Sequence, residues 1–266
     1  MKLTTAAATI AIIGIVSTAQ AMALDVEDND SSFGVVMVEE SDEGQHRQLG
    51  NRNNWVRKFN VRIDNLSFQQ PLGGVFVMTH NNRVNPLYQM GEEASEELAD
   101  LAETGNPAAL VEKFDGKHGV ASASSVDGPL RPGASREFKV TLSRNYPYLT
   151  LGSMAINTND CFVALNGVRI GRYGSLFNLP GLDAGSEVNN ELCTSIPGPG
   201  CALGGGNVRS GGGEGFVHIH RGFHGINTGL EHSLKVEDLR PDGQALSAVG
   251  YDWRNPMVRV TITPCH

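Results

Sequence analysis

Three acidic residues, Asp160, Asp183 and Glu187, stand in segments rich in Asn, Gly and Ser. Asp160 precedes a short apolar stretch at residues 161–165, and the other two acids lie four residues apart beyond it. Loops that are held by a rigid sheet and carry only oxygen ligands suit a hard cation such as calcium. The same spacing also fits acids that cap turns and stay in solvent. Further candidates for oxygen ligands of the same cation are Asn157, Asn159, Asn189, Asn190 and Glu191.

A second set of possible metal ligands is the histidine-rich segment at residues 217–224. His218 and His220 share one face of an expected strand, and His224 can approach from the following turn. Three imidazoles suit a catalytic zinc or copper ion. The alternative is that Val217 and Ile219 face the core and the histidines lie on the polar face of the sheet. No general base stands at metalloprotease spacing.

Two other kinds of chemistry lack their sequence signatures. The chain has no Gly-x-Ser-x-Gly motif for a serine nucleophile. Two glycine runs, at residues 204–206 and 211–213, are not followed by Lys-Ser/Thr and a helix. They are therefore expected to form a flexible loop and not a phosphate-binding loop.

The N-terminus resembles a secretory signal peptide. Lys2 is followed by an apolar core at residues 6–16, and the segment ends in a small-x-small pattern at Ala21. Residues 1–21 are expected to be removed, which predicts a secreted protein, or a periplasmic or cell-surface protein if the source is bacterial. Residues 22–54 are acidic and polar and are expected to form a mobile lead-in, with an edge strand possible at residues 33–38.

Composition limits the partners. The 21 Lys and Arg residues against 29 Asp and Glu residues give a formal charge of −8, which argues against nucleic acid or anionic lipid as the main partner. The mature chain has the length of a single large β domain of about 200–250 residues, expected at residues 55–266. The sequence does not indicate the oligomeric state.

Four cysteines, in a chain expected to be exported, favour two disulfides. Three pairings are possible. We favour Cys193–Cys201, which closes a loop rich in Pro and Gly, and this leaves Cys161 to pair with Cys265. No two cysteines have the short spacing of a zinc knuckle.

Alternation of apolar and polar residues predicts several strands, and one region predicts helices. The expected helix at residues 92–103 stops at Gly105, and a second short helix follows Pro107. The acidic outer face of the first helix is expected to be solvated. Many short strands with one helical insertion predict an antiparallel β-sandwich. The strands are expected at residues 59–66, 75–78, 136–142 and 258–263.

An ordered series of motifs across residues 55–262 resembles the spondin N-terminal domain, a domain of animal extracellular matrix proteins and of single-domain exported proteins. The motifs that carry this resemblance are Phe59–Leu66, Gln70–Leu72, Val75–His80, Asn85–Tyr88, Gly91–Glu103, Gly133–Ser135, Leu149–Met154, Asn159–Asp160, Asp183–Glu187 and Trp253–Val260.

This resemblance implies an all-β, eight-stranded antiparallel sandwich similar to calcium/phospholipid-binding sandwich domains. It also implies a calcium site in the loops at one end, with Asp160, Asp183 and Glu187 in the positions of the family's carboxylates. Two residues depart from the family. Glu187 stands where Asp is usual, and Cys161 stands where Trp is common, so a disulfide could pin the strand there.

The resulting hypothesis is an exported, non-enzymatic, calcium-binding module that acts in adhesion through an extracellular or cell-surface protein or glycan. One alternative is a metal-dependent enzyme that uses the three histidines. Another is calcium-dependent lipid binding, which would need basic or apolar residues on the calcium loops. Candidates for that role are Arg169, Arg172 and Phe177.

Overall fold

The computed structural model describes residues 55–201 and 208–265. The described residues all belong to one compact unit. The expected signal peptide, the acidic lead-in and its possible strand lie outside the described residues, so they stay predictions. Within the described part, no helix is long and apolar enough to cross a bilayer.

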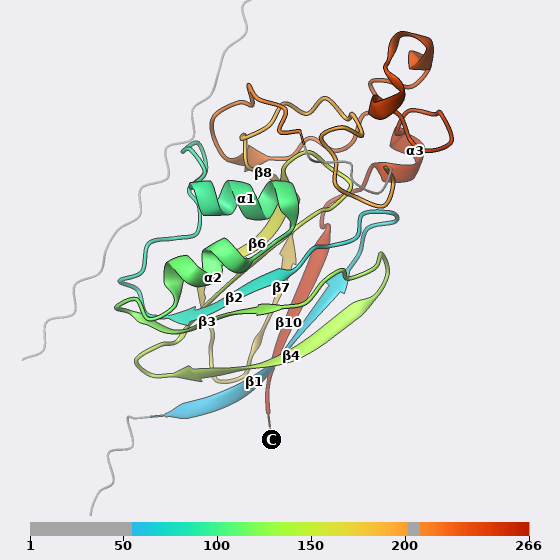
Figure 1. The fold of residues 1–266 in the computed structure, drawn as a ribbon. Coiled ribbons are helices and arrows are strands. Elements are labelled where there is room, and N and C mark those ends of the chain that lie inside the picture. Colours follow the sequence, from blue (N-terminus) through green and yellow to red (C-terminus); the bar gives the residue numbers. More distant parts are fainter. Residues whose placement is uncertain (1–54, 202–207, 266) are drawn as a thin grey trace, which may run out of the picture. The chain divides into compact units, whose positions relative to one another are not determined.

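One layer of the fold is a four-stranded antiparallel sheet in the order β4-β1-β10-β7 (Figure 1). The alternation expected for its central strand is confirmed, because Phe59, Val61 and Ile63 are buried. These side chains enter the core between the two sheets. The strands are β1 (Val56–Asn65), β4 (Ser135–Ser143), β7 (Ser175–Leu179) and β10 (Val258–Pro264).

The other layer is a six-stranded antiparallel sheet in the order β3-β2-β5-β6-β8-β9. Strand β2 is buried on both faces: Val75 and Val77 face the first sheet, whereas Phe76 and Met78 belong to a second core beneath the helices. The strands are β2 (Val75–His80), β3 (Val120–Val126), β5 (Tyr148–Met154), β6 (Cys161–Arg169), β8 (Leu182–Asp183) and β9 (His218–Ile219).

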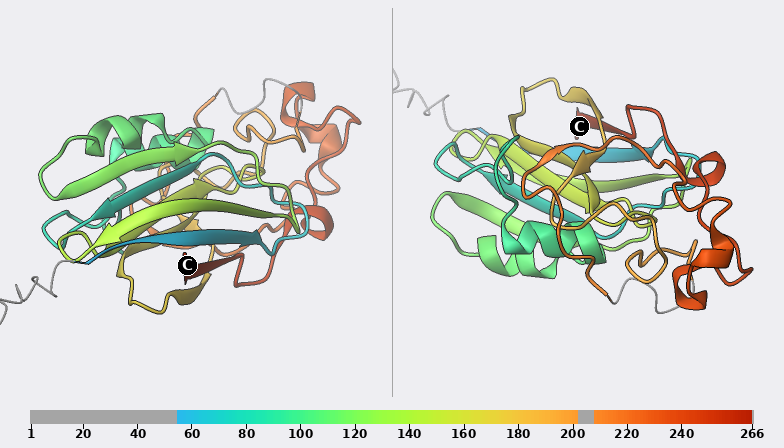
Figure 2. Two further views of the ribbon diagram at one scale, coloured as in Figure 1. Left: turned by 90° about the horizontal axis from the view of Figure 1, so that it is seen from below. Right: turned by 90° about the horizontal axis from the view of Figure 1, so that it is seen from above.

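Two helices, α1 (Glu96–Thr104) and α2 (Ala108–Phe114), cover the outer face of the six-stranded sheet (Figures 1 and 2). Ser95 caps α1, and Gly105 ends it in the left-handed conformation, as the sequence predicts. One detail of the expected solvated face is wrong: Glu103 is buried. The short helices that follow β9 are η1 (Glu231–Ser233), η2 (Val236–Asp238) and α3 (Ala248–Tyr251).

The expected antiparallel β-sandwich with a helical insertion is therefore confirmed at the level of two facing sheets. The two sheets together hold ten strands in the described residues, of which β8 and β9 are only two residues long. These two short strands extend the sheet beside β6, and they carry the residues of the candidate site.

Of the two expected disulfides, Cys193–Cys201 is present with sulfur atoms 2.13 Å apart, whereas Cys161–Cys265 is wrong. Cys265 lies beyond the end of β10, where its N–H donates to Lys58. Cys161 lies at the opposite end of that strand, because its sulfur and the Trp253 ring both contact Gly181. The seven residues of β10 span about 20 Å, and a disulfide needs Cα atoms within about 7 Å.

Candidate functional site

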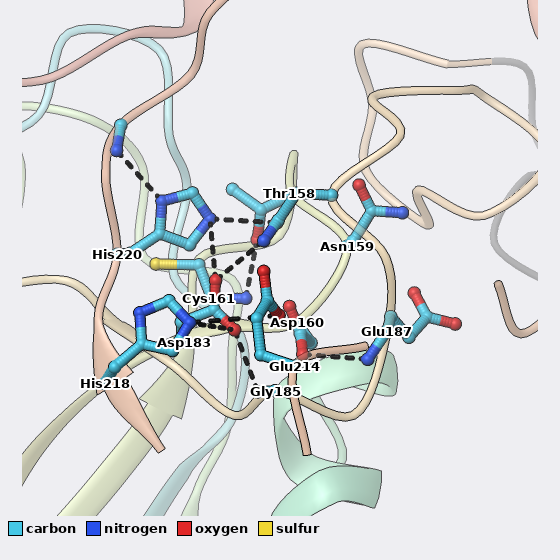
Figure 3. A network of polar contacts seen from close by, with 12 residues as sticks. Thr158, Asn159, Asp160, Cys161, Asp183, Gly185, Glu187, Glu214, His218 and His220 are labelled. Carbon is cyan, nitrogen blue, oxygen red and sulfur yellow. Dashed lines mark hydrogen bonds and ion pairs between the residues drawn. The ribbon is translucent and has the colours of Figure 1, made fainter. Parts of the chain in front are cut away.

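The site lies at the edge of the six-stranded sheet where β6 begins. Cys161 pairs with Asp183 of β8, and Asp183 pairs in turn with His218 of β9. The Thr158 hydroxyl fixes the turn before β6, since it accepts from Cys161 N–H and donates to a backbone carbonyl. Asp160 precedes β6 directly, so backbone pairing brings Asp160, Asp183 and His218 to one place (Figure 3).

Asp160 is fully buried, and its two carboxylate oxygens differ. Oδ2 accepts hydrogen bonds from the N–H groups of Ser186 (2.8 Å) and Glu187 (3.0 Å). Oδ1 has no hydrogen-bond partner among the described residues. Burial, followed by the charge of Asp183, raises the pKa of Asp160 to about 7. A cation beside Oδ1 would relieve both causes of this shift.

Glu187 is also buried, but its side chain turns away from the two histidines (Figure 3). Its Oε1 accepts from Ser210 N–H (2.8 Å), and no part of the described chain bonds to Oε2. Burial is the main cause that raises the pKa of Glu187 to about 7, and the charge of Glu103 adds to it.

Glu103 is a member of this acidic group that the sequence analysis missed. It projects from the last turn of α1 and is only 7% exposed. Its Oε2 pairs with Arg209 at 2.5 Å, whereas its Oε1 has no partner in the described structure. The pattern of apolar residues in the helix did not predict that Glu103 is buried. The loop that carries Arg209 covers Glu103, which would otherwise face solvent.

Asp183 stands at the centre of the site and is fully buried. Gly185 N–H donates to its Oδ1 (2.8 Å), and the Asn189 side-chain amide donates to its Oδ2 (2.7 Å). The same two oxygens face the imidazoles of His218 (3.7 Å) and His220 (3.8 Å). Asp183 therefore connects the predicted carboxylate group with the histidine segment, which the sequence analysis treated as rival sites.

Glu214 completes a compact group that was not predicted. In the described part of the chain, Asp183, Glu214 and His218 form the group of three possible ligand atoms within 4.8 Å of one another. Glu214 directly follows the glycine run at residues 211–213, which was expected to form a flexible loop, so its position gave no signal. Its Oε2 lies 3.8 Å from His218 Nε2.

His220 has a different environment from His218. It is buried against Trp253, with ring centroids 5.0 Å apart, and Ile219 is exposed. The alternative of an apolar inner face is therefore half right: Val217 is buried as expected, but Ile219 is exposed and His220 faces the interior. Burial is the main cause that lowers the pKa of His220 to about 4, so this imidazole is neutral at neutral pH.

Buried polar atoms without hydrogen bonds concentrate at this end of the sandwich. Of five such side-chain atoms in the described residues, four belong to Glu103, Asp160, Glu187 and His218. All four are carboxylate oxygens or an imidazole nitrogen, which are the usual ligand atoms for metal ions. Because buried polar groups are nearly always bonded in native proteins, this concentration marks the candidate metal centre.

Two of the further ligand candidates have structural roles instead. Glu191 accepts hydrogen bonds from the N–H groups of His224 (2.6 Å) and Ile226 (2.8 Å). Asn157 donates to the Gln69 carbonyl. Both side chains fix loops. Asn159 and Asn190 bond to each other beside the site.

The three-histidine site does not assemble, and one residue of the lipid-binding alternative lies far from the candidate site. The three imidazoles do not form a group of three ligand atoms within the described ranges, and His224 is exposed. Arg169 ends β6, eight residues from the site, which is a distance of about 26 Å along a strand. Arg169, one of the two basic residues considered for lipid contact, therefore lies at the far end of the sandwich.

Comparisons with known proteins do not assign this chain to a family. No protein-family model matches the chain, and no curated protein sequence matches it.

Proposed function

We propose that this protein is an exported, non-enzymatic β-sandwich module whose loops at one end bind calcium. Asp160, Asp183 and Glu187 are the proposed ligands, as the resemblance to the spondin N-terminal domain implies. Within the described residues these three carboxylates do not form a group with ligand atoms inside 4.8 Å, so the Glu187 side chain must turn toward Asp160 to join them (Figure 3). The observation that carries the proposal is the pair of buried carboxylate oxygens, Oδ1 of Asp160 and Oε2 of Glu187, without a partner in the described structure.

The residues at this end fit calcium in their chemistry. Asp160 and Glu187 are buried acids whose raised pKa values report uncompensated negative charge. Glu103 supplies another carboxylate oxygen without a described partner. Calcium takes about six to eight oxygen ligands from carboxylates, carbonyls and water.

The surface around these loops supports a role in binding. Several exposed apolar side chains belong to the segments that carry the proposed site, and exposed apolar groups that cluster usually mark binding surfaces. The Phe216 ring lies 5.4 Å from the His218 ring, centroid to centroid, and is tilted against it, and Val188 follows Glu187 directly. We infer that calcium orders this surface for an extracellular or cell-surface protein or glycan. The exposed apolar residues are Val188, Val208, Phe216 and Ile219.

A thermal melt tests the calcium proposal. The oxidised mature protein is melted at pH 7.5 in chelator, then with calcium and then with magnesium. At a calcium concentration near 100 times Kd, binding adds about 2.7 kcal/mol to the free energy of unfolding. This corresponds to a rise in Tm of about 5–10 °C for a domain of this size.

The matched variants are Asp160→Asn, which removes the buried charge, and Glu112→Gln, which changes an exposed acid on α2. The calcium increment should vanish in the first and persist in the second. An equal increment in both variants would reject Asp160 as a ligand.

A further inference from the structure

We propose that Asp183, Glu214 and His218 form a second metal site, which takes a transition-metal ion such as Zn²⁺. Their ligand atoms lie within 4.8 Å of one another. This site includes a nitrogen ligand and therefore differs in kind from the oxygen ligands proposed for calcium. It does not depend on the calcium proposal, although Asp183 belongs to both groups.

The hydrogen bonds of His218 leave one ring nitrogen available as a ligand. Nδ1 lies 2.9 Å from the Ile219 carbonyl oxygen, and a carbonyl only accepts, so Nδ1 carries the hydrogen. In the neutral ring, Nε2 then carries the lone pair. This nitrogen is buried and has no hydrogen-bond partner in the described residues. A ring held by a carbonyl on its other nitrogen is typical of metal-binding histidines.

The distances fit ligands around a metal ion. His218 Nε2 lies 3.7 Å from Asp183 Oδ1 and 3.8 Å from Glu214 Oε2, and both separations are too long for hydrogen bonds. Two ligand atoms that each lie about 2.0–2.2 Å from a zinc ion can be this far apart. The metal would therefore occupy space that direct contacts leave open.

Asp183 is held in place for such a role. Gly185 N–H bonds to Oδ1, and the Asn189 amide bonds to Oδ2. Each carboxylate oxygen retains a second lone-pair direction, so these bonds orient the group and leave it able to bind a metal. Glu214 is 40% exposed in its side chain and leaves one side of the site open to solvent.

His220 is a positioning residue and not a ligand. Gly222 N–H donates to His220 Nδ1 (3.1 Å), so the ring hydrogen lies on Nε2. Nε2–H then donates to the Asn189 Oδ1 atom (3.2 Å), and the Asn189 amide donates to Asp183. This chain of hydrogen bonds fixes the orientation of the Asp183 carboxylate. His220 has no free nitrogen lone pair with which to bind a metal.

The test is a zinc titration by calorimetry on oxidised, chelator-stripped protein with Cys265→Ser, because Cys265 is an exposed thiol that could bind zinc. The variants are His218→Gln, Glu214→Gln and the control His224→Gln, which changes an exposed histidine. We expect one zinc ion per chain, with affinity at least about tenfold weaker in the first two variants. The control should bind as the parent does.

Calcium titrations on the same proteins separate the two proposals. His218→Gln and Glu214→Gln should keep the calcium affinity of the parent, and Asp160→Asn should keep its zinc affinity. Co²⁺ absorption gives a second readout, since visible bands of a low-symmetry site should appear in the parent and not in His218→Gln.

The inference is overturned if the parent binds no zinc or if His218→Gln binds it unchanged. Equal loss in His224→Gln would also overturn it, since that result indicates unspecific binding to surface histidines. Because Glu214 is partly exposed in a loop, Glu214→Gln is expected to fold even if His218→Gln does not.

Discussion

The Asp160 carboxylate accepts a 3.0 Å hydrogen bond from the backbone N–H of Glu187, while the Glu187 side chain points to the other side of that loop (Figure 3). Asp160 therefore holds the loop that carries the next acid. Both carboxyl groups are buried, and each has one oxygen without a hydrogen-bond partner among the described residues. A metal ion at Asp160 would thus stabilise the loop and the charge together.

The affinity for calcium is expected to rise with pH between about 5.5 and 7.5. The pKa values of Asp160 and Glu187 are raised to about 7, so the folded chain holds protons that the unfolded chain has lost. Without metal, the stability these groups contribute is present below their ordinary pKa of about 4 and is lost as pH rises through about 7. Calcium must displace those protons, so Kd should fall about tenfold per pH unit for each proton displaced.

Calorimetric titration at four pH values measures this slope. His220 cannot produce it, because its pKa is lowered to about 4 and the ring stays neutral across the range. A Kd that does not change with pH would show that neither carboxyl group loses a proton on binding.

Glu191→Ala should destabilise the protein without changing its calcium response. The substitution leaves the N–H groups of His224 and Ile226 without their acceptor. Each lost partner costs about 1–3 kcal/mol, which lowers Tm by about 4–24 °C in total. The fall should be equal in chelator and in calcium, as measured by thermal melts.

Glu187→Gln is the matched comparison for Glu191→Ala. It keeps an oxygen for Ser210 N–H and removes a buried charge, so Tm in chelator should change little or rise. The calcium increment should be lost. If Glu191→Ala loses that increment instead, the roles of the two acids are reversed.

The thiols should react in two stages. Cys265 is exposed, whereas Cys161 is buried and its burial raises the pKa of the thiol. A disulfide reagent such as dithiobis(nitrobenzoate) should therefore titrate one thiol per folded oxidised chain and a second after denaturation. Finding none in denaturant would mean that Cys161 and Cys265 are paired after all.

The disulfide should stabilise the loop that it closes. Cys193 and Cys201 are eight residues apart, so the cross-link removes about 2–3 kcal/mol of loop entropy from the unfolded chain. The double variant Cys193→Ser/Cys201→Ser should melt about 4–12 °C lower. An unchanged Tm would show that the disulfide does not stabilise this end of the domain, and that the hydrogen bonds of Glu191 and its neighbours do so instead.

The parts of the fold that depend on local pattern could be predicted from the sequence. The alternation in β1 predicts one buried face, and Gly105 predicts the end of α1, because each depends on nearby residues only. The pairing of Cys161 with Cys265 failed because it depends on which end of β10 faces β6. A count of cysteines holds no information about that distance.

Only part of the site could be predicted from the sequence. Asp160 and Asp183 stand at strand ends that a sandwich brings together, and the turn chemistry around them is visible in the sequence. Glu103 and Glu214 were missed because their burial and contacts come from segments far along the chain. The histidine segment was treated as a rival site, because no local pattern shows that β9 pairs with β8.

The most direct test of the account is a calcium titration by calorimetry at pH 7.5 on the oxidised, chelator-stripped protein and on Asp160→Asn. The account predicts one calcium ion bound per chain in the parent and no measurable binding in the variant. Binding of equal affinity in both proteins, or no binding in the parent, would contradict the proposal that the Asp160 end of the sandwich is a calcium site.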